Sequence, residues 1–212
     1  MSDWLIYSIG FIAQILFSSR LLLQWITSEK RKKVVTPVLF WMLSLIASFL
    51  LFIYGYLRDD FAIMFGQTLT YFIYIRNLQL QNQWQKIPFI IRWFIYLIPS
   101  LIVIYYFNNN ISDRMNLFQN EDIPFWLLVL GIVSQITFTL RFVYQWLYSE
   151  RQKKSVLPFG FWLLSLIGSS LIFVYAIIRV DYVLIVGNVF GMVIYIRNLI
   201  LLRREYLILS GK

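Results

Sequence analysis

Cysteine and histidine are both absent from this chain of 212 residues. Without cysteine there is no disulfide framework, no thiolate nucleophile and no cysteine metal site. Without histidine the chain lacks the side chain that proteins use most often as a general base and as a metal ligand. Charged residues are also scarce, at 14% of the chain. These absences weaken most enzymatic functions, so we expect no enzyme activity, no metal and no cofactor.

Apolar residues dominate instead, because 60% of the chain is hydrophobic and 19% is aromatic. A soluble domain of this length cannot bury so much apolar surface, so the composition indicates an integral membrane protein. A membrane-spanning helix needs about 20 mostly apolar residues. Seven segments meet this requirement: 4–26, 36–57, 61–80, 87–107, 123–147, 157–178 and 182–202. The first has no basic leader and no small-residue cleavage site, so we expect a retained helix rather than a cleaved signal.

The charged residues between these segments alternate in sign. One set of connections carries "EKRKK", Lys86, "ERQKK" and "RREYLILSGK", and the other carries Asp3, "RDD", "SDRMNLFQNED" and "RVD". An excess of Lys and Arg marks cytoplasmic loops. We therefore expect a multi-pass protein of the inner (cytoplasmic) membrane, with its N-terminus outside and its C-terminus in the cytoplasm. The net charge of +9 follows mostly from this asymmetry; it suits anionic lipid headgroups and requires no nucleic acid.

An internal repeat is the strongest signal in the sequence. Residues 14–78 align with residues 135–199 without a gap, and about half of the positions are identical. "LLLQWITSEKRKK" matches "FVYQWLYSERQKK", and "LSLIAS" matches "LSLIGS". The hexapeptide "IYIRNL" occurs in both copies. Each copy contains three of the apolar segments.

The number of helices per repeat determines the architecture. Two directly joined three-helix units would lie inverted in the membrane, whereas one additional helix between them restores the same orientation. The apolar segment 87–107 matches nothing in the repeat and supplies that helix. We therefore predict an all-α membrane protein with a 3+1+3 plan: repeat 1 at 1–82, a linker helix at 83–110 and repeat 2 at 111–212. Two parallel repeats related by an axis along the membrane normal are a known transporter plan.

These motifs also resemble a known family. The order Gln-Trp-x-x-Ser-Glu-basic, Pro-x-x-Phe-Trp-x-x-Ser-Leu-x-x-Ser, Arg-x-Asp and Ile-Tyr-x-Arg-Asn-Leu is similar to the lipid-A-disaccharide-synthase N-terminal-like domain. That family is related to the PQ-loop proteins, which include the SWEET sugar transporters with their own 3+1+3 plan. The PQ dipeptide itself is absent here, and no soluble glycosyltransferase segment follows, so disaccharide synthase activity is not expected. The resemblance implies a glycolipid or lipid-linked sugar as ligand and a membrane glycosyltransferase as a possible partner.

The candidate binding residues occur in pairs, one in each repeat. Arg20 and Arg141 lie about two turns inside the cytoplasmic ends of their helices, and an arginine there must snorkel, pair or face water. One turn further on, Gln24 and Gln145 share the arginine's helix face. Arginine binds phosphate through its planar fork. A ring of four arginines with amides between them would suit a phosphosugar headgroup, and we assign the remaining members of this set as Arg76, Asn77, Arg197 and Asn198.

Aromatic residues and helix-end residues complete the candidate set. Tyr74 and Tyr195 are placed to hydrogen-bond a sugar or to anchor the membrane interface, and Trp41 and Trp162 to stack on a sugar ring or to fill the bundle. The expected outer gate or structural ion pairs are Arg58, Asp60, Arg179 and Asp181, and Pro37 and Pro158 are expected near helix starts. Glu29 and Glu150 are expected to form ion pairs at helix ends.

Three functions remain open from the sequence. The first is a transporter or flippase for a phosphorylated glycolipid or lipid-linked sugar. The second is a SWEET-like carrier of small soluble sugars, which does not need internal arginines. The third is a non-transporting scaffold that recruits a glycosyltransferase to its lipid substrate.

Overall fold

The computed structural model describes residues 3–57, 61–109, 125–178 and 182–210, and these residues form helices without any strand. The elements, in chain order, are α1 (Asp3–Arg31), α2 (Val38–Leu57), α3 (Phe61–Leu80), the short 3-10 helix η1 (Trp84–Lys86), α4 (Phe89–Asn109), α6 (Phe125–Gln152), α7 (Phe159–Ile178) and α8 (Tyr182–Leu209). Each expected apolar segment therefore contains an α-helix, and the prediction of an all-helical chain is confirmed for the described residues.

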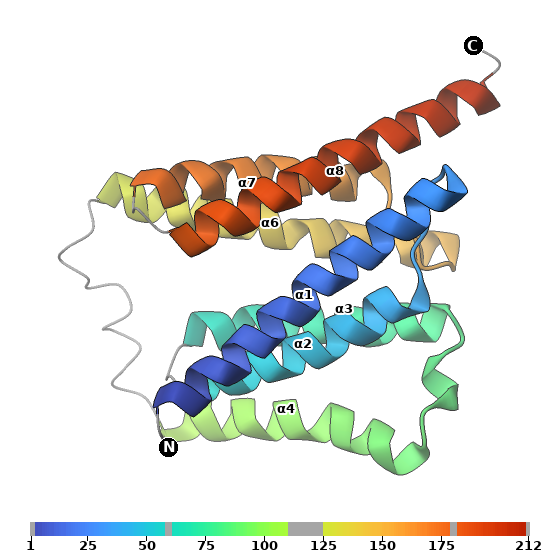
Figure 1. Ribbon diagram of the computed structural model, residues 1–212. Coiled ribbons are helices and arrows are strands. Elements are labelled where there is room, and N and C mark those ends of the chain that lie inside the picture. The colour runs from blue at the N-terminus through green and yellow to red at the C-terminus, as the bar shows by residue number, and fades with distance from the viewer. Residues whose placement is uncertain (1–2, 58–60, 110–124, 179–181, 211–212) are drawn as a thin grey trace.

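The helices form two groups of three with α4 beside the first group (Figure 1). Within the groups, α2 packs against α1 and α3, and α7 packs against α6 and α8. The groups meet where α3 packs against α6 and where α1 packs against α8. We call this contact between the repeats the seam. Because α1 corresponds to α6 and α3 to α8, the two halves of the seam are equivalent by the internal repeat.

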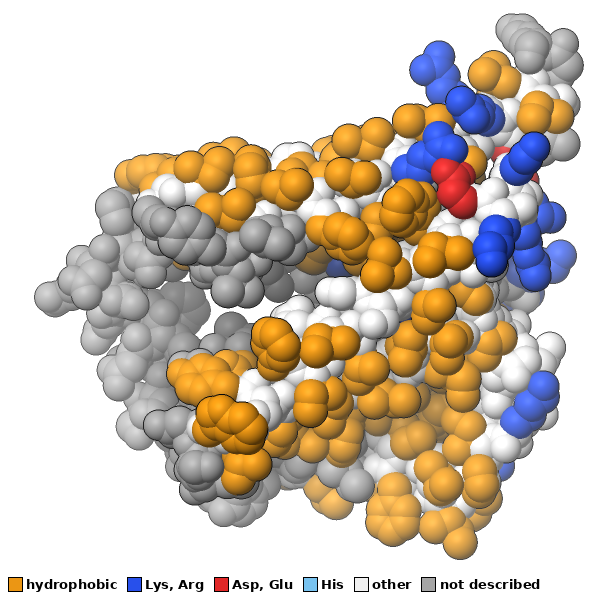
Figure 2. Space-filling view, in the orientation of Figure 1, with side chains coloured by type: hydrophobic (Ala, Val, Ile, Leu, Met, Phe, Trp, Pro, Cys, Tyr) orange, Lys and Arg blue, Asp and Glu red, His pale blue; other side chains and the backbone are white. Residues whose placement is uncertain are grey.

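Three described helices are long and apolar enough to cross a membrane, judged by length and composition: Trp4–Arg31, Val38–Leu57 and Phe159–Ile178. Helices α3, α6 and α8 carry buried polar residues of the seam, such as Asn77, Gln145 and Asn198. Hydrophobic side chains cover much of the described surface in Figure 2, whereas Lys and Arg gather at one end. We call this the basic end; its exposed residues include Lys32, Lys33, Lys153 and Lys154. Seven spans in a SWEET-like arrangement remain a prediction.

The two loops at the basic end have matching structures. Pro37 and Pro158 directly precede α2 and α7, and their carbonyls accept hydrogen bonds from Phe40 and Phe161. Proline suits such a position because no helical partner is needed for its missing N–H. Ser28 accepts a hydrogen bond from the backbone N–H of Val35 at 3.1 Å, and the equivalent Ser149 accepts one from Val156 at 3.2 Å. The loops are thereby fixed close to the helices that carry the candidate site.

The linker helix α4 packs on α3 through Tyr96. The Tyr96 hydroxyl accepts a hydrogen bond from Gln79 Nε2 at 2.9 Å. Its ring also lies 5.3 Å from the Trp84 ring in an edge-on arrangement and 6.4 Å from Phe72 in a stacked one. The linker therefore covers one flank of repeat 1 as well as joining the repeats.

The expected outer set lies outside the described residues: Arg58, Asp60, Arg179 and Asp181. The stretches that contain them connect α2 to α3 and α7 to α8.

Candidate anion-binding site between the two repeats

Arg20 of α1 and Arg141 of α6 meet inside the bundle. Their exposed fractions are 5% and 6%. Both guanidinium groups lie over one ring, because the Cζ atoms of Arg20 and Arg141 are 5.4 Å and 4.7 Å from the centroid of Phe142. The burial of both side chains argues against a snorkelling role, since a snorkelling arginine exposes its charged head. The structure thus brings together two like charges, one from each repeat.

Neither arginine has a carboxylate partner among the described residues. Arg20 Nη1 donates to Ser44 Oγ at 2.6 Å, and Arg141 Nη1 donates to the Tyr195 hydroxyl at 3.3 Å. The Nε atoms of both arginines are buried and have no hydrogen-bond partner in the ranges that the structure describes. A cation within a membrane costs several kcal/mol unless it is paired. Contacts with aromatic faces offset only part of this cost. One such contact is with Phe138, whose ring centroid lies 3.3 Å from Arg141 Cζ.

Two tryptophans add further unused donors nearby. Trp41 and Trp162 are fully buried, and no described residue supplies an acceptor for the Nε1 atom of either. Trp41 packs on Tyr74 at 5.9 Å, and Trp162 packs on Tyr195 at 6.1 Å. Because Arg20 and Arg141 also lie over these two tyrosine rings, each repeat contributes one arginine–tyrosine–tryptophan cluster. Both clusters offer hydrogen-bond donors and positive charge, which is the chemistry that an acceptor-rich anion requires.

The four amides of the candidate set join the repeats to each other. Gln24 Nε2 donates to Asn198 Oδ1 at 2.9 Å, and Asn198 Nδ2 donates back at 3.2 Å. The equivalent pair, Asn77 and Gln145, exchanges hydrogen bonds of 3.1 Å and 2.8 Å. All four side chains are fully buried. Each amide also hydrogen-bonds within its own repeat, as Gln24 does to Ser28 and Gln145 to Ser149, so the four side chains tie the seam to both repeats.

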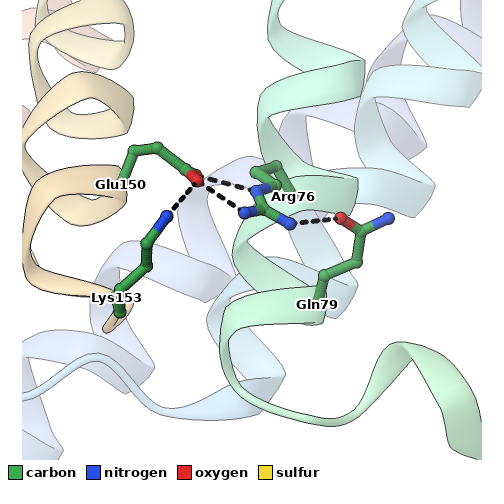
Figure 3. A network of polar contacts seen from close by, with 4 residues as sticks. All are labelled: Arg76, Gln79, Glu150 and Lys153. Carbon is green, nitrogen blue, oxygen red and sulfur yellow. Dashed lines mark hydrogen bonds and ion pairs between the residues drawn. The ribbon is translucent and has the colours of Figure 1, made fainter.

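The remaining two arginines form ion pairs across the seam. Arg76 of α3 donates to both carboxylate oxygens of Glu150 on α6, at 2.8 Å and 2.6 Å, and Figure 3 shows this fork together with Lys153 and Gln79. Arg197 of α8 makes the equivalent bidentate contact with Glu29 of α1. Hydrogen bonds from Arg76 and from Lys153 lower the pKa of Glu150 from 4.5 to about 2. The seam at the basic end is therefore closed by two amide pairs and two ion pairs.

The structure divides the residues predicted from sequence into two groups. Arg20, Arg141, Tyr74, Tyr195, Trp41 and Trp162 surround the unpaired positive charge. Gln24, Asn77, Gln145, Asn198, Arg76 and Arg197 hold the repeats together on the side of the basic end. The sequence did not assign Phe142, which contacts both arginines, because its counterpart in repeat 1 is Leu21 and the pair is not conserved within the repeat. No group of three Asp, Glu, His or Cys side chains suited to a metal occurs among the described residues.

Comparison with known proteins agrees with the internal repeat. The family described as Lipid A Biosynthesis N-terminal domain matches the chain twice, at residues 9–79 and 130–200. The chain is 31% identical over 211 residues to a protein named lipid-A-disaccharide synthase from Chlamydia felis (strain Fe/C-56), covering 94% of this chain and 33% of the relative. The proteins of that name from Chlamydia caviae (strain ATCC VR-813 / DSM 19441 / 03DC25 / GPIC) and Chlamydia pneumoniae are each 30% identical, covering 92% and 95% of this chain and 32% and 34% of the relatives. The chain thus spans about a third of the length of these relatives. No solved structure matches it significantly.

Proposed function

Because the chain belongs to the Lipid A Biosynthesis N-terminal domain family, we propose that it is a membrane transporter or flippase for a phosphorylated glycolipid or lipid-linked sugar. The substrate's phosphate binds between the repeats at Arg20 and Arg141. Its sugar contacts the adjoining tyrosine and tryptophan rings. The protein lies in the inner membrane with several spanning helices and its basic end toward the cytoplasm.

The observation that carries this proposal is the pair of buried arginines that have no carboxylate partner among the described residues. A phosphate oxygen accepts charge-assisted hydrogen bonds from guanidinium groups, and each such bond contributes about 1.5–3 kcal/mol. An anion would therefore offset both the desolvation of the two cations and their mutual repulsion. A neutral sugar would relieve neither, so this observation favours a phosphorylated ligand over a SWEET-like carrier of neutral sugars.

The contacts across the seam support a transport cycle. The protein is closed between the arginine site and the basic end by two ion pairs and two amide pairs. The ion pairs are Arg76–Glu150 and Arg197–Glu29, and the amide pairs are Gln24–Asn198 and Asn77–Gln145. Alternating access in transporters built from two repeats requires such contacts to form and break as the repeats move. In the proposed cycle, this arrangement is the state closed toward the basic end.

A scaffold is the second candidate function, and one comparison favours it. The relatives named lipid-A-disaccharide synthase are about three times as long as the region that matches this chain. A domain of this kind could present a glycolipid to a membrane glycosyltransferase without moving it across the membrane. The same arginine site would then hold the lipid.

Translocation in reconstituted vesicles tests the first function against the second. The purified protein is inserted into vesicles that contain a fluorescent phosphorylated glycolipid, and the lipid's accessibility to a membrane-impermeant quencher is followed with time. We expect faster exchange between leaflets than in protein-free vesicles, and slower exchange when both Arg20 and Arg141 are replaced by Gln. Arg203→Gln, at an exposed position of the basic end, is the matched control and is expected to leave exchange unchanged.

The other outcomes identify the alternatives. Retention of the lipid by the purified protein in native mass spectrometry, without any exchange between leaflets, would support the scaffold and reject the transporter. Uptake of a neutral sugar that is insensitive to both arginine substitutions would instead support a SWEET-like carrier.

A further inference from the structure

Repeat 2 carries an open apolar groove on its outer flank, near the basic end. Its volume is about 880 Å³. The groove lies between the start of α7 and the second half of α8, with Tyr148 of α6 at its edge, and its walls include Leu166, Ile196, Leu199 and Ile200. Arg203 and Glu205 lie at its rim toward the basic end.

The equivalent flank of repeat 1 is filled. Ile75 corresponds to Ile196, and the exposed fractions of the two side chains are 2% and 46%. Leu78 is likewise buried at 1%, whereas its counterpart Leu199 lies in the groove wall. The two repeats thus provide a comparison within one chain: the same apolar surface is covered in one copy and open in the other.

The linker supplies the cover in repeat 1. Trp84 of η1 is buried against α3, and α4 adds Ile95 and Tyr96 to the same cluster. The hydrogen bond between Gln79 and Tyr96 fixes the register of α4 on this surface. Gln79 corresponds to Ile200 in the groove. A helix seated in the groove at the depth of α4 would therefore meet the apolar Ile200 at the level where repeat 1 offers the polar Gln79.

We propose that the groove of repeat 2 is the docking site for α4 of a second copy of this chain. The repeats are parallel in the predicted topology, so a second copy inserted in the same membrane orientation presents its α4 in the direction that α4 has on repeat 1. The outward face of α4 is apolar and unoccupied, and its exposed residues recur every three or four positions: Phe89, Trp93, Leu97, Leu101 and Ile104. The exposed Lys86 precedes α4 at the basic end, where the groove lining carries both Arg203 and Glu205, so Lys86 would meet an acidic group there as well as a basic one.

This contact uses two different surfaces, the groove of one copy and α4 of the next. Such head-to-tail contacts form a ring when the rotation closes and a chain when it does not. Each copy has one groove and one outward α4 face, so every copy in a ring makes the same two contacts. The contact lies away from the seam, and its failure therefore leaves the proposed arginine site intact.

Cysteine cross-linking tests the contact directly, because the natural chain contains no cysteine. Two differently tagged chains are expressed together, one carrying Leu97→Cys and the other Ile200→Cys, and the membranes are treated with a short thiol cross-linker. We expect a cross-linked dimer that carries both tags. The matched control pairs Leu97→Cys with Ile46→Cys and should give no such dimer. Ile46 is exposed on α2, as far from the start of α2 as Leu97 is from the start of α4.

A second variant fills the groove. Ile196→Trp on the Ile200→Cys chain is expected to abolish the mixed-tag dimer, whereas Val174→Trp, at an exposed position of α7 outside the groove, should not. Ile200→Trp, tested by the mass of the protein in nanodiscs, serves if Ile196→Trp does not fold. A monomeric mass in nanodiscs together with no mixed-tag dimer above the Ile46 control would overturn the proposal. Cross-linking of Ile200→Cys to a different protein, or a lipid retained in the groove of a monomer, would overturn it too.

Discussion

At the scale of single residues, charge decides which of the candidate side chains are available to a ligand. Arg76 and Arg197 each have a glutamate from the other repeat, so a ligand would have to compete with a bidentate ion pair. Within the described part of the chain, the hydrogen-bond acceptors of Arg20 and Arg141 are Ser44 and Tyr195. A phosphate therefore gains more from the second pair than from the first.

Replacing these arginines should weaken the binding of anionic glycolipid. Arg20→Gln removes one charge-assisted contact, and we expect an affinity about ten- to a hundredfold lower, because each 1.4 kcal/mol corresponds to a factor of ten. Arg141→Gln should have a similar effect, whereas Arg20→Lys keeps the charge, loses the planar fork and should bind at an intermediate affinity. Titration with a phosphorylated glycolipid in detergent measures these affinities. Unchanged binding by both Gln variants would show that the anion does not lie between the two arginines.

Glu150 should make stability depend on pH in a predictable range. Its pKa falls from 4.5 to about 2 in the folded protein, so its ion pair contributes fully above about pH 4.5 and is lost as the pH falls toward 2. Glu150→Gln lacks this contribution. We expect the difference in thermal stability between the natural protein and Glu150→Gln to be constant from pH 8 to pH 5 and to decrease at lower pH. A difference that instead grew below pH 5 would contradict the ion pair with Arg76.

At the scale of helices, α6 and α7 approach each other closely at Gly168. A Cβ atom added at Gly168 would lie 2.9 Å from both the Cα and N atoms of Phe138, and a helix backbone cannot move away as a flexible side chain can. Gly168→Ala should therefore destabilise the protein by about 1–3 kcal/mol, as overpacking usually does. Unfolding in mild detergent measures the loss. Ile167→Ala, at an exposed position beside it, is the control and should have a much smaller effect.

The linker helix gives a second prediction at this scale. Tyr96→Leu removes a hydrogen bond to Gln79 and two aromatic contacts, so we expect a stability loss of about 1–2 kcal/mol from the hydrogen bond and packing together. The arginine site lies away from α4, so glycolipid affinity should not change. Tyr96→Phe separates the two contributions because it removes only the hydroxyl. Loss of glycolipid binding in a folded Tyr96→Leu protein would instead include the linker in the site.

The positions of the helices were easier to predict from the sequence than the contacts between them. Apolar length alone located the α-helices, and Pro37 and Pro158 indicated where α2 and α7 begin, since those signals are local. The ion pairs were only half predictable. Glu29 and Glu150 were expected to pair at helix ends, but a chain gives no local sign that their partners are Arg197 and Arg76 of the other repeat. That choice depends on the packing of α1 on α8 and of α3 on α6.

At the scale of the whole molecule, the repeat predicted paired residues and could not predict asymmetry. It paired Arg20 with Arg141, whose guanidinium groups both lie over the Phe142 ring, and it placed all four arginines in one ring, because depth in a membrane says little about which neighbour satisfies a charge. Phe142 was missed since Leu21 stands at the matching position. The open groove was missed for a similar reason. Helix α3 of repeat 1 ends at Leu80 and is followed by the covering helices η1 and α4, whereas its counterpart α8 in repeat 2 extends to Leu209.

The number of membrane crossings is the last testable property, and the two basic loops decide it. With seven spans, Lys33 and Lys153 follow α1 and α6 and lie on the same, cytoplasmic side, opposite Ser2. If only the three described helices that are long and apolar enough to span a membrane crossed it, α1, α2 and α7, the two lysines would lie on opposite sides. Single cysteines at Ser2, Lys33, Lys153 and Ser210 in the cysteine-free chain can be labelled in intact cells with an impermeant maleimide. We expect labelling at Ser2 alone, with the other three labelled only after permeabilisation. This pattern follows from the Lys and Arg excess near the loops at 29–33 and 150–154 and from their position at one end of the bundle in Figure 2. Labelling of Lys33 and Lys153 on opposite sides would reject both the seven-span topology and the parallel repeats on which the shared arginine site depends.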